Sequence, residues 1–309
     1  PPAEGPATAA KSPHGARLRP ASMSGAAFCA ACHKVGLTPA ITHAGWLRGQ
    51  DDYGAWLASM AAGNGVGAVY RPETLQVKVC QDCHMPLEPL RSGRMVRSHR
   101  FLGGNSALPH LRDATDMAQR EGDFLRGAVS LDIAILRPQA GGPDVPQFAD
   151  RVPVPESGHV QFDVILRNRR VGHRFPGGTN DSNDVWVEIA LSAPDQPGAP
   201  ILVDGSHLVR AQPVDSDGRP LLRRDPQNMR AGIYNTSVAP ADPQVVRYAA
   251  DLASLPALQA ALRRGALTLR ATLRYRKFTP DYAQFACAAL PAGPSRSRCL
   301  QPPTVDVAQ

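Results

Sequence analysis

Two copies of one cysteine motif carry the clearest chemistry in this sequence. Residues 29–33 read CAACH and residues 80–84 read CQDCH, so both follow the pattern C-x-x-C-H. In such a motif the two thiols add to the vinyl groups of one porphyrin, and the imidazole of the following residue binds the iron. The sequence therefore predicts two haem c groups. The predicted attachment residues are Cys29, Cys32, Cys80 and Cys83, and the predicted iron ligands are His33 and His84.

Two other interpretations use the same residues. Two C-x-x-C pairs can build a zinc site, with the histidines incidental to it. A single pair can also be a thioredoxin-type redox motif when it lies in a βαβ unit. A His directly follows each pair, and no βαβ pattern surrounds either pair. Four of the six cysteines fall in the two motifs, which argues against chance and favours haem attachment.

The residue on the far side of each iron decides what a haem does. A second protein ligand gives a low-spin electron carrier, whereas an open position permits ligand binding or catalysis. The first candidate for this distal position is His99, which follows the second motif closely. His14, in the segment before the first motif, and His173, in a Gly-rich turn between predicted strands, come next. Weaker candidates or residues with expected structural roles are His43, His110, His159, His207 and Met60.

The composition is that of a globular protein large enough for two domains. The chain has 309 residues, 43% of them hydrophobic, and a formal net charge of +7. Arginines are spread along the chain without a nucleic-acid motif, so we expect no nucleic-acid partner. No apolar run is long enough for a transmembrane helix. The first residues carry no secretory signal, which suggests a mature or trimmed N-terminus, or the soluble part of a longer protein.

The hydrophobic period changes near residue 127. Before that point, short stretches at residues 53–60 and 111–126 have the spacing of amphipathic helices. After it, apolar residues alternate strictly with polar ones, which predicts antiparallel strands with one buried face. The predicted strands cover 129–135, 160–166, 185–191 and 267–275, with weaker ones near 201–204 and 244–248 and a helix at about 255–264.

These patterns predict an α+β protein with two domains. We expect a loop-rich, mostly helical dihaem cytochrome c domain, followed by an antiparallel β-sandwich. The expected boundaries are an extended arm at 1–22, the dihaem domain at 23–126, the sandwich at 127–280 and a tail at 281–309.

Two cysteines, Cys287 and Cys299, lie outside the haem motifs. In an oxidising compartment such a pair is expected to form a disulfide, for which about 3 kcal/mol of stabilisation is typical. Two free thiols are the alternative. Covalent haem attachment takes place outside the bacterial cytoplasm. We therefore expect a periplasmic or otherwise extracytoplasmic bacterial protein in which the tail carries this disulfide.

Several segments together resemble the bacterial multihaem c-type cytochromes. The resemblance rests on the two C-x-x-C-H motifs, GQDDY at 49–53, SHRFLG at 98–103 and VGHRFPGG at 171–178, and it covers most of residues 14–190. Members of this family look like respiratory electron-transfer proteins, and many are longer, membrane-anchored and richer in haem. The resemblance places His99 in a family-like segment. It also supports His14, because relatives often carry a His shortly before a C-x-x-C-H unit.

The predicted function is therefore the relay of single electrons through two haems. Redox proteins are the expected partners, and a larger membrane-associated respiratory or multihaem complex is another possible setting. One alternative is a dihaem enzyme, a peroxidase or small-molecule reductase, in which one haem keeps an open position. Another is a haem-bearing structural subunit of a larger respiratory complex. No catalytic set is visible in the sandwich, so an electron carrier is favoured over an enzyme.

Overall fold

The structure is a computed structural model of the chain. It describes residues 21–43, 45–64, 77–139, 142–148, 153, 159–196, 198–252 and 254–309. The arm expected at 1–22 falls almost wholly outside the described residues, and so does His14. None of the helices in the described part has the length and hydropathy that a membrane span requires.

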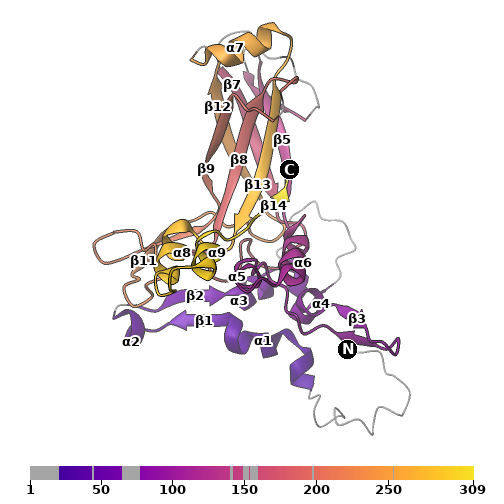
Figure 1. The fold of residues 1–309 in the computed structure, drawn as a ribbon, viewed down its shortest axis with the longest axis vertical. Coiled ribbons are helices and arrows are strands. Elements are labelled where there is room, and N and C mark those ends of the chain that lie inside the picture. The colour runs from indigo at the N-terminus through magenta and orange to yellow at the C-terminus, as the bar shows by residue number, and fades with distance from the viewer. Residues whose placement is uncertain are drawn as a thin grey trace.

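Two four-stranded antiparallel sheets form the elongated upper part of the molecule (Figure 1). The first has the order β12-β7-β5-β6 and the second has the order β14-β13-β8-β9. The strands of the first sheet are β5 (Ser130–Gln139), β6 (Gly142–Gln147), β7 (His159–Arg167) and β12 (Pro243–Asp251). Those of the second are β8 (Asp184–Ser192), β9 (Leu202–Leu208), β13 (Thr268–Arg276) and β14 (Thr304–Ala308).

One hydrophobic core lies between these sheets. Alternate residues of β7, such as Val164 and Leu166, meet Val185 and Val187 of β8 and Leu273 of β13 in a single cluster. This two-residue period is the one that the sequence shows, because side chains on a strand point alternately to opposite faces. The strands predicted from that period are confirmed. The predicted helix is also present, as α7 (Pro256–Arg263), which packs at the far end of the sandwich (Figure 1).

The last thirty residues form two helices and a strand that pack on the rest of the molecule. Helices α8 (Pro280–Cys287) and α9 (Pro294–Leu300) are joined by a disulfide between Cys287 and Cys299, and α9 packs against α5 (Ala107–Leu111). The final strand, β14, pairs with β13 and completes the second sheet. A separate hairpin, β10 (Ala211–Val214) with β11 (Ala231–Asn235), extends from the same end of the sandwich.

The part that contains both cysteine motifs is not mostly helical, which corrects the prediction. Its two-stranded sheets are β1 (Lys34–Leu37) with β2 (Leu47–Asp51), and β3 (Leu87–Pro89) with β4 (Met95–Arg97). Its helices are η3 (Ala21–Ser24), α1 (Ala26–His33), α2 (Pro39–Thr42), α3 (Asp52–Leu57), η4 (Met60–Ala62), α4 (Cys80–His84), α5 and α6 (Thr115–Leu125). All but α6 have eight residues or fewer, so loops and hairpins make up much of this part.

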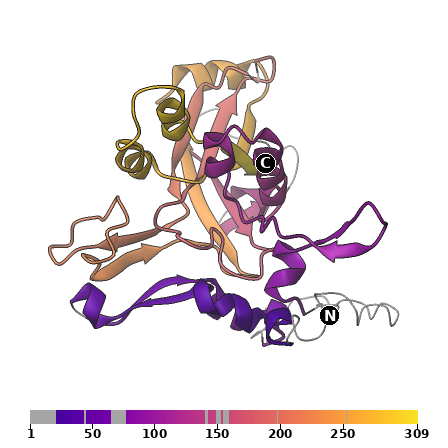
Figure 2. The same ribbon diagram turned by 60° about the horizontal axis from the view of Figure 1, so that its bottom comes forward.

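The predicted helix around residues 53–60 begins and ends as the local sequence dictates. Asp51 caps α3, because its carboxylate accepts a hydrogen bond of 2.6 Å from the Gly54 N–H. Gly63 follows η4 at φ = 82°, a left-handed conformation that glycine adopts without strain. Seen from below, α1 and the β1–β2 hairpin lie along the base of the molecule, beneath the sandwich and the β10–β11 hairpin (Figure 2).

Candidate functional site

The two C-x-x-C-H motifs lie on neighbouring short helices. The first forms the end of α1 and the second forms the whole of α4, and the two helices contact each other. The thiols of Cys29 and Cys80 are neighbours. Burial and this neighbouring thiol raise the pKa of Cys80 to about 11, and burial also raises the pKa of Cys83. Both raised pKa values favour the neutral thiol at Cys80 and Cys83.

Helix α4 is held in place from both ends. The Gln81 amide donates to the carbonyl oxygens of Met23 and Gly25 at 3.1 and 3.0 Å, which ties α4 to the start of α1. Arg97 of β4 donates to the Gln81 and Met85 carbonyl oxygens at 3.0 and 3.2 Å. Its guanidinium also pairs with the Asp82 carboxylate at 2.7 Å. The second motif is thus fixed by partners that lie outside it.

His84 is oriented by two neighbours. Its Nδ1 lies 2.5 Å from the Leu102 carbonyl oxygen, and its ring centroid lies 5.5 Å from that of Phe124 on α6. Burial lowers the pKa of His84, and the nearby His173 lowers it further, so the neutral imidazole is favoured. A neutral ring with Nδ1 engaged by a backbone carbonyl presents Nε2 as its free ligand atom, as metal-binding histidines typically do.

The loop that carries Leu102 is itself anchored by a buried carboxylate. Glu121 of α6 is 3% exposed, and its Oε2 accepts hydrogen bonds from the backbone N–H groups of Gly103, Gly104 and Asn105 at 3.0, 2.7 and 3.2 Å. The Gly104 carbonyl in turn accepts a hydrogen bond of 2.9 Å from the Tyr275 hydroxyl of β13. Through this loop, α6 and the sandwich together determine where His84 points.

Replacing Glu121 with alanine is expected to destabilise the protein by about 3 kcal/mol, because one buried and two part-buried N–H donors lose their acceptor. Glu121→Gln retains one acceptor oxygen and is the matched control, with a smaller expected loss. Chemical denaturation of the two variants and the parent protein measures the difference. Equal stability of Glu121→Ala and the parent would show that the loop does not depend on this carboxylate.

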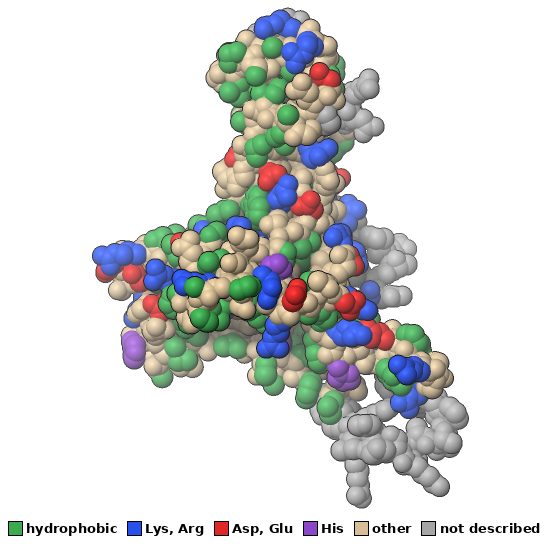
Figure 3. All heavy atoms as spheres, in the orientation of Figure 1, with side chains coloured by type: hydrophobic (Ala, Val, Ile, Leu, Met, Phe, Trp, Pro, Cys, Tyr) green, Lys and Arg blue, Asp and Glu red, His purple; other side chains and the backbone are tan. Residues whose placement is uncertain are grey.

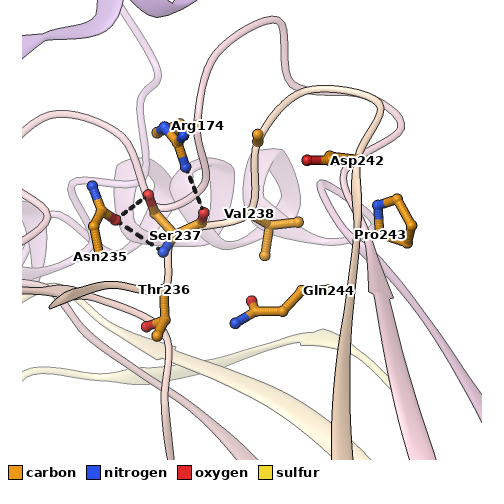
Figure 4. Close-up of a pocket in the computed structure, with 9 residues that line it drawn as sticks. Arg174, Asn235, Thr236, Ser237, Val238, Asp242, Pro243 and Gln244 are labelled. Atoms are coloured by element: carbon orange, nitrogen blue, oxygen red, sulfur yellow. Dashed lines mark hydrogen bonds between the residues drawn. The ribbon is translucent and has the colours of Figure 1, made fainter. Parts of the chain in front are cut away.

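His173 lies on a loop, residues 168–178, that the sandwich holds rigidly. The buried Asn168 donates to the His173 and Val238 carbonyl oxygens at 2.8 and 3.2 Å. Phe175 and Val238 exchange two backbone hydrogen bonds of 2.9 and 2.7 Å. Arg174 reaches the Ser237 carbonyl oxygen at 3.0 Å, as Figure 4 shows beside a small pocket of about 210 Å³. These bonds fix the backbone on both sides of His173.

Glycines in this loop allow close contacts that any side chain would block. A Cβ at Gly172 would lie 2.9 Å from the Ala61 Cβ, so the loop packs directly against the end of the α3–η4 segment. A Cβ at Gly177 would lie 2.6 Å from the His173 Cε1 atom and 2.9 Å from the Asp52 Oδ1 atom. The GHRFPGG segment therefore lets the sandwich approach the part with the cysteine motifs, and it packs the His173 ring against its own loop.

The structure brings His173 next to His84. Their ring centroids lie 6.2 Å apart, and their planes are 11° from parallel. The His173 Nδ1 lies 2.8 Å from the Arg174 carbonyl oxygen, so both rings engage backbone carbonyls through Nδ1. Two imidazoles on opposite sides of one metal atom would have this spacing, since two metal–nitrogen bonds of about 2 Å in line place the ring centres about 6 Å apart.

The surroundings of His33 are different. Its Nδ1 lies 3.2 Å from the Gln50 amide nitrogen and 3.6 Å from the Asp52 Oδ2 atom, and its side chain is 55% exposed. Among the described residues, no second imidazole ring lies next to His33 in the way that His173 lies next to His84. A cavity of about 510 Å³ adjoins Gln50 and Asp52 and extends between β1–β2, the His173 loop and the β10–β11 hairpin.

His99, the first distal candidate from the sequence, lies elsewhere. Its exposed ring donates through Nδ1 to the Arg97 carbonyl oxygen at 3.0 Å and packs edge-on to Phe101. His43 is an exposed residue at the end of α2, and His110 lies in the last turn of α5. His159 and His207 lie on sandwich strands β7 and β9. Met60, which begins η4, is half-buried.

The segment with the two motifs buries almost no hydrophobic side chains of its own. In its described residues up to 110, only Ala26 and Ala107 are buried hydrophobics. Phe28, Trp46 and Phe101 are 55%, 62% and 59% exposed. Figure 3 shows hydrophobic side chains along the lower edge of the molecule. A polypeptide segment with this much exposed apolar surface fits a large apolar group that completes its core.

The described residues do not fit the zinc alternative. In the described ranges, no three His, Cys, Asp or Glu side chains converge as they would to hold a metal ion. A structural zinc site needs four such ligands around one point. Each motif by itself supplies the two thiols and the imidazole that one porphyrin attachment site requires. In this fit, Cys29, Cys32 and His33 would hold one haem, and Cys80, Cys83 and His84 would hold the other.

Comparison with known proteins gives one structural likeness. No protein family matches the sequence, and no curated protein matches it. Among solved structures, the fold is similar to that of a penta-haem cytochrome c552 from Thermochromatium tepidum, with a TM-score of 0.54 and 16% sequence identity. The alignment covers 94% of this chain and 56% of that chain, so this chain spans about half the length of that cytochrome. The shared property is the fold.

Proposed function

We propose that this chain is an extracytoplasmic electron-transfer protein with two covalently bound haem c groups. The observation that carries the proposal is the pairing of His84, which completes the second motif, with His173. The two rings have the separation that one metal atom requires, and both Nδ1 atoms engage backbone carbonyls. The likeness to a penta-haem cytochrome adds support from the fold.

Each residue has a defined role in this proposal. Cys80 and Cys83 attach the second haem, His84 is its proximal ligand, and His173 is its distal ligand. Cys29 and Cys32 attach the first haem, with His33 as its proximal ligand. For the first haem, the distal candidates remain His14, which lies outside the described residues, and His99. When bound, each haem supplies one-electron iron chemistry, and two axial protein ligands favour electron transfer over catalysis.

The arrangement of the chain suits transfer between two centres. The contact between α1 and α4, where Cys29 neighbours Cys80, supports two attachment sites that lie side by side. The sandwich holds His173 on a rigid loop, so the second iron would keep its ligands during oxidation and reduction. The disulfide between Cys287 and Cys299 supports an oxidising compartment. A redox protein is the proposed partner.

Mass spectrometry of the denatured protein tests the proposal directly. We expect two covalently bound haems for each chain, because each motif supplies two thiols, and a low-spin ferric spectrum for at least the haem at His84. A haem-free protein, or one that binds zinc in place of haem, would contradict the proposal. A single bound haem would restrict it to one motif.

The asymmetry between the two sites favours one alternative, a dihaem enzyme with an open position at the His33 haem. His33 is half-exposed, no described imidazole faces it, and a cavity adjoins the residues that contact it. Carbon monoxide separates the two functions. An electron carrier with both haems fully ligated does not bind it when reduced, whereas an enzyme of this kind binds it at one haem.

A further inference from the structure

One carboxylate lies between the two predicted haem sites. The Asp52 Oδ2 atom is 3.6 Å from the His33 Nδ1 atom, and the Asp52 Oδ1 atom is 3.9 Å from the His173 Nδ1 atom. His33 belongs to the first motif, while His173 faces His84 of the second. Asp52 is therefore within ion-pair distance of one predicted ligand from each site.

The Asp52 carboxylate is held in this position by several contacts. Its Oδ1 accepts a hydrogen bond of 2.8 Å from the Gly178 N–H, and its Oδ2 accepts one of 3.4 Å from the Gln50 amide. Asp52 is also the first residue of α3, and its side chain is 22% exposed. Because these partners come from α3, β2 and the sandwich loop, the charge cannot move away from either histidine without breaking them.

A negative charge beside a ligating imidazole stabilises the oxidised metal. At 3.6 and 3.9 Å from the two rings, the Asp52 carboxylate acts through space, because it interacts favourably with the extra positive charge of the oxidised state. The 22% exposure of Asp52 reduces solvent screening of this effect compared with a surface carboxylate.

We propose that the Asp52 carboxylate is shared by both haem sites, and that its charge beside His33 and His173 lowers the reduction potentials of both haems. This inference rests on the proposed function, because it needs haem at both motifs. It assigns Asp52 a role in electron transfer that closeness to a motif does not reveal, since it lies nineteen positions after His33 and farther from the second motif.

Asp51 provides a matched control for Asp52. It is the adjacent carboxylate and caps the same helix, but its carboxylate pairs with Arg48 at 3.2 Å and accepts from the Gly54 N–H. No contact joins Asp51 to either histidine among the described interactions. Asp51→Asn therefore removes one negative charge from the same helix end without touching a predicted ligand.

Spectroelectrochemical titration of Asp52→Asn, Asp52→Glu and Asp51→Asn in the haem-loaded protein tests the inference. We expect Asp52→Asn to raise both midpoint potentials. The expected change in the reduction equilibrium constant of each haem is about tenfold, which corresponds to about 59 mV for one electron. Asp52→Glu keeps the charge and is expected to lie nearer the parent protein. Asparagine retains an acceptor for the Gly178 N–H, so the fold is expected to persist.

Three outcomes would overturn the inference. These are potentials unchanged by Asp52→Asn, a shift in one haem alone, and an equal shift in Asp51→Asn. Haem content is measured in the same samples by mass spectrometry. Absence of haem from the parent protein contradicts the proposed function itself, whereas two bound haems with unchanged potentials contradict only the role of Asp52.

Discussion

Replacing His173 with alanine is expected to convert the haem at His84 from low spin to high spin, while both haems stay covalently attached. The attachment depends on the four cysteines, whereas the spin state depends on the second axial ligand. In the structure His173 is the imidazole that faces His84, at a centroid separation of 6.2 Å. The reduced variant should bind carbon monoxide at this haem, which optical and electron paramagnetic resonance spectra of the ferric and reduced protein measure.

Three further variants test whether the effect is specific to His173. Gly177→Ala leaves the imidazole in place, but its new methyl group would lie 2.6 Å from the His173 Cε1 atom, so we expect part of the haem at His84 to become high-spin. His159→Ala is the control, because His159 is an exposed residue of β7 in the sandwich. His99→Ala tests the residue that the sequence favours most as a distal ligand. If His99→Ala opened the haem at His84 and His173→Ala did not, the proposed pairing of His84 with His173 would be wrong.

The regular part of the fold follows from local patterns. Strict alternation in stretches such as 160–166 and 267–275 needs only a period of two residues, and the structure has β7 and β13 there. The short hairpins β1–β2 and β3–β4 have three to five residues per strand, too few to establish a period. This is why the segment with the cysteine motifs was wrongly predicted to be mostly helical.

The histidine that faces His84 could not be found by closeness in sequence. His99 was ranked first because it follows the second motif, but the chain turns away through β3 and β4 and leaves its ring exposed. His173 reaches His84 from another part of the fold, since Asn168 and Val238 fix its loop on the sandwich. The available signal was the run of glycines around His173, which indicates a backbone that must approach another segment closely. Asp52 lies in the GQDDY segment that contributes to the resemblance, but nothing in that segment indicated contact with a histidine.

A protein that lacks haem is expected to keep its sandwich and to lose the structure of the segment with the two motifs. The sandwich has its own core, in which Val164, Val187 and Leu273 are fully buried. In the described residues up to 110, the buried hydrophobics are only Ala26 and Ala107. Few buried apolar contacts mean low local stability, so this segment depends on an apolar group that the polypeptide does not supply.

Substitution of all four motif cysteines by serine produces such a protein, and hydrogen exchange measures the result for each segment. We expect rapid exchange in α1, α3 and α4 and slow exchange in β7, β8 and β13, with the disulfide between Cys287 and Cys299 intact. The haem-loaded parent should protect both parts. Equal protection of α1 and α4 with and without haem would mean that the polypeptide alone stabilises this segment, and its exposed aromatic residues would then need a different explanation.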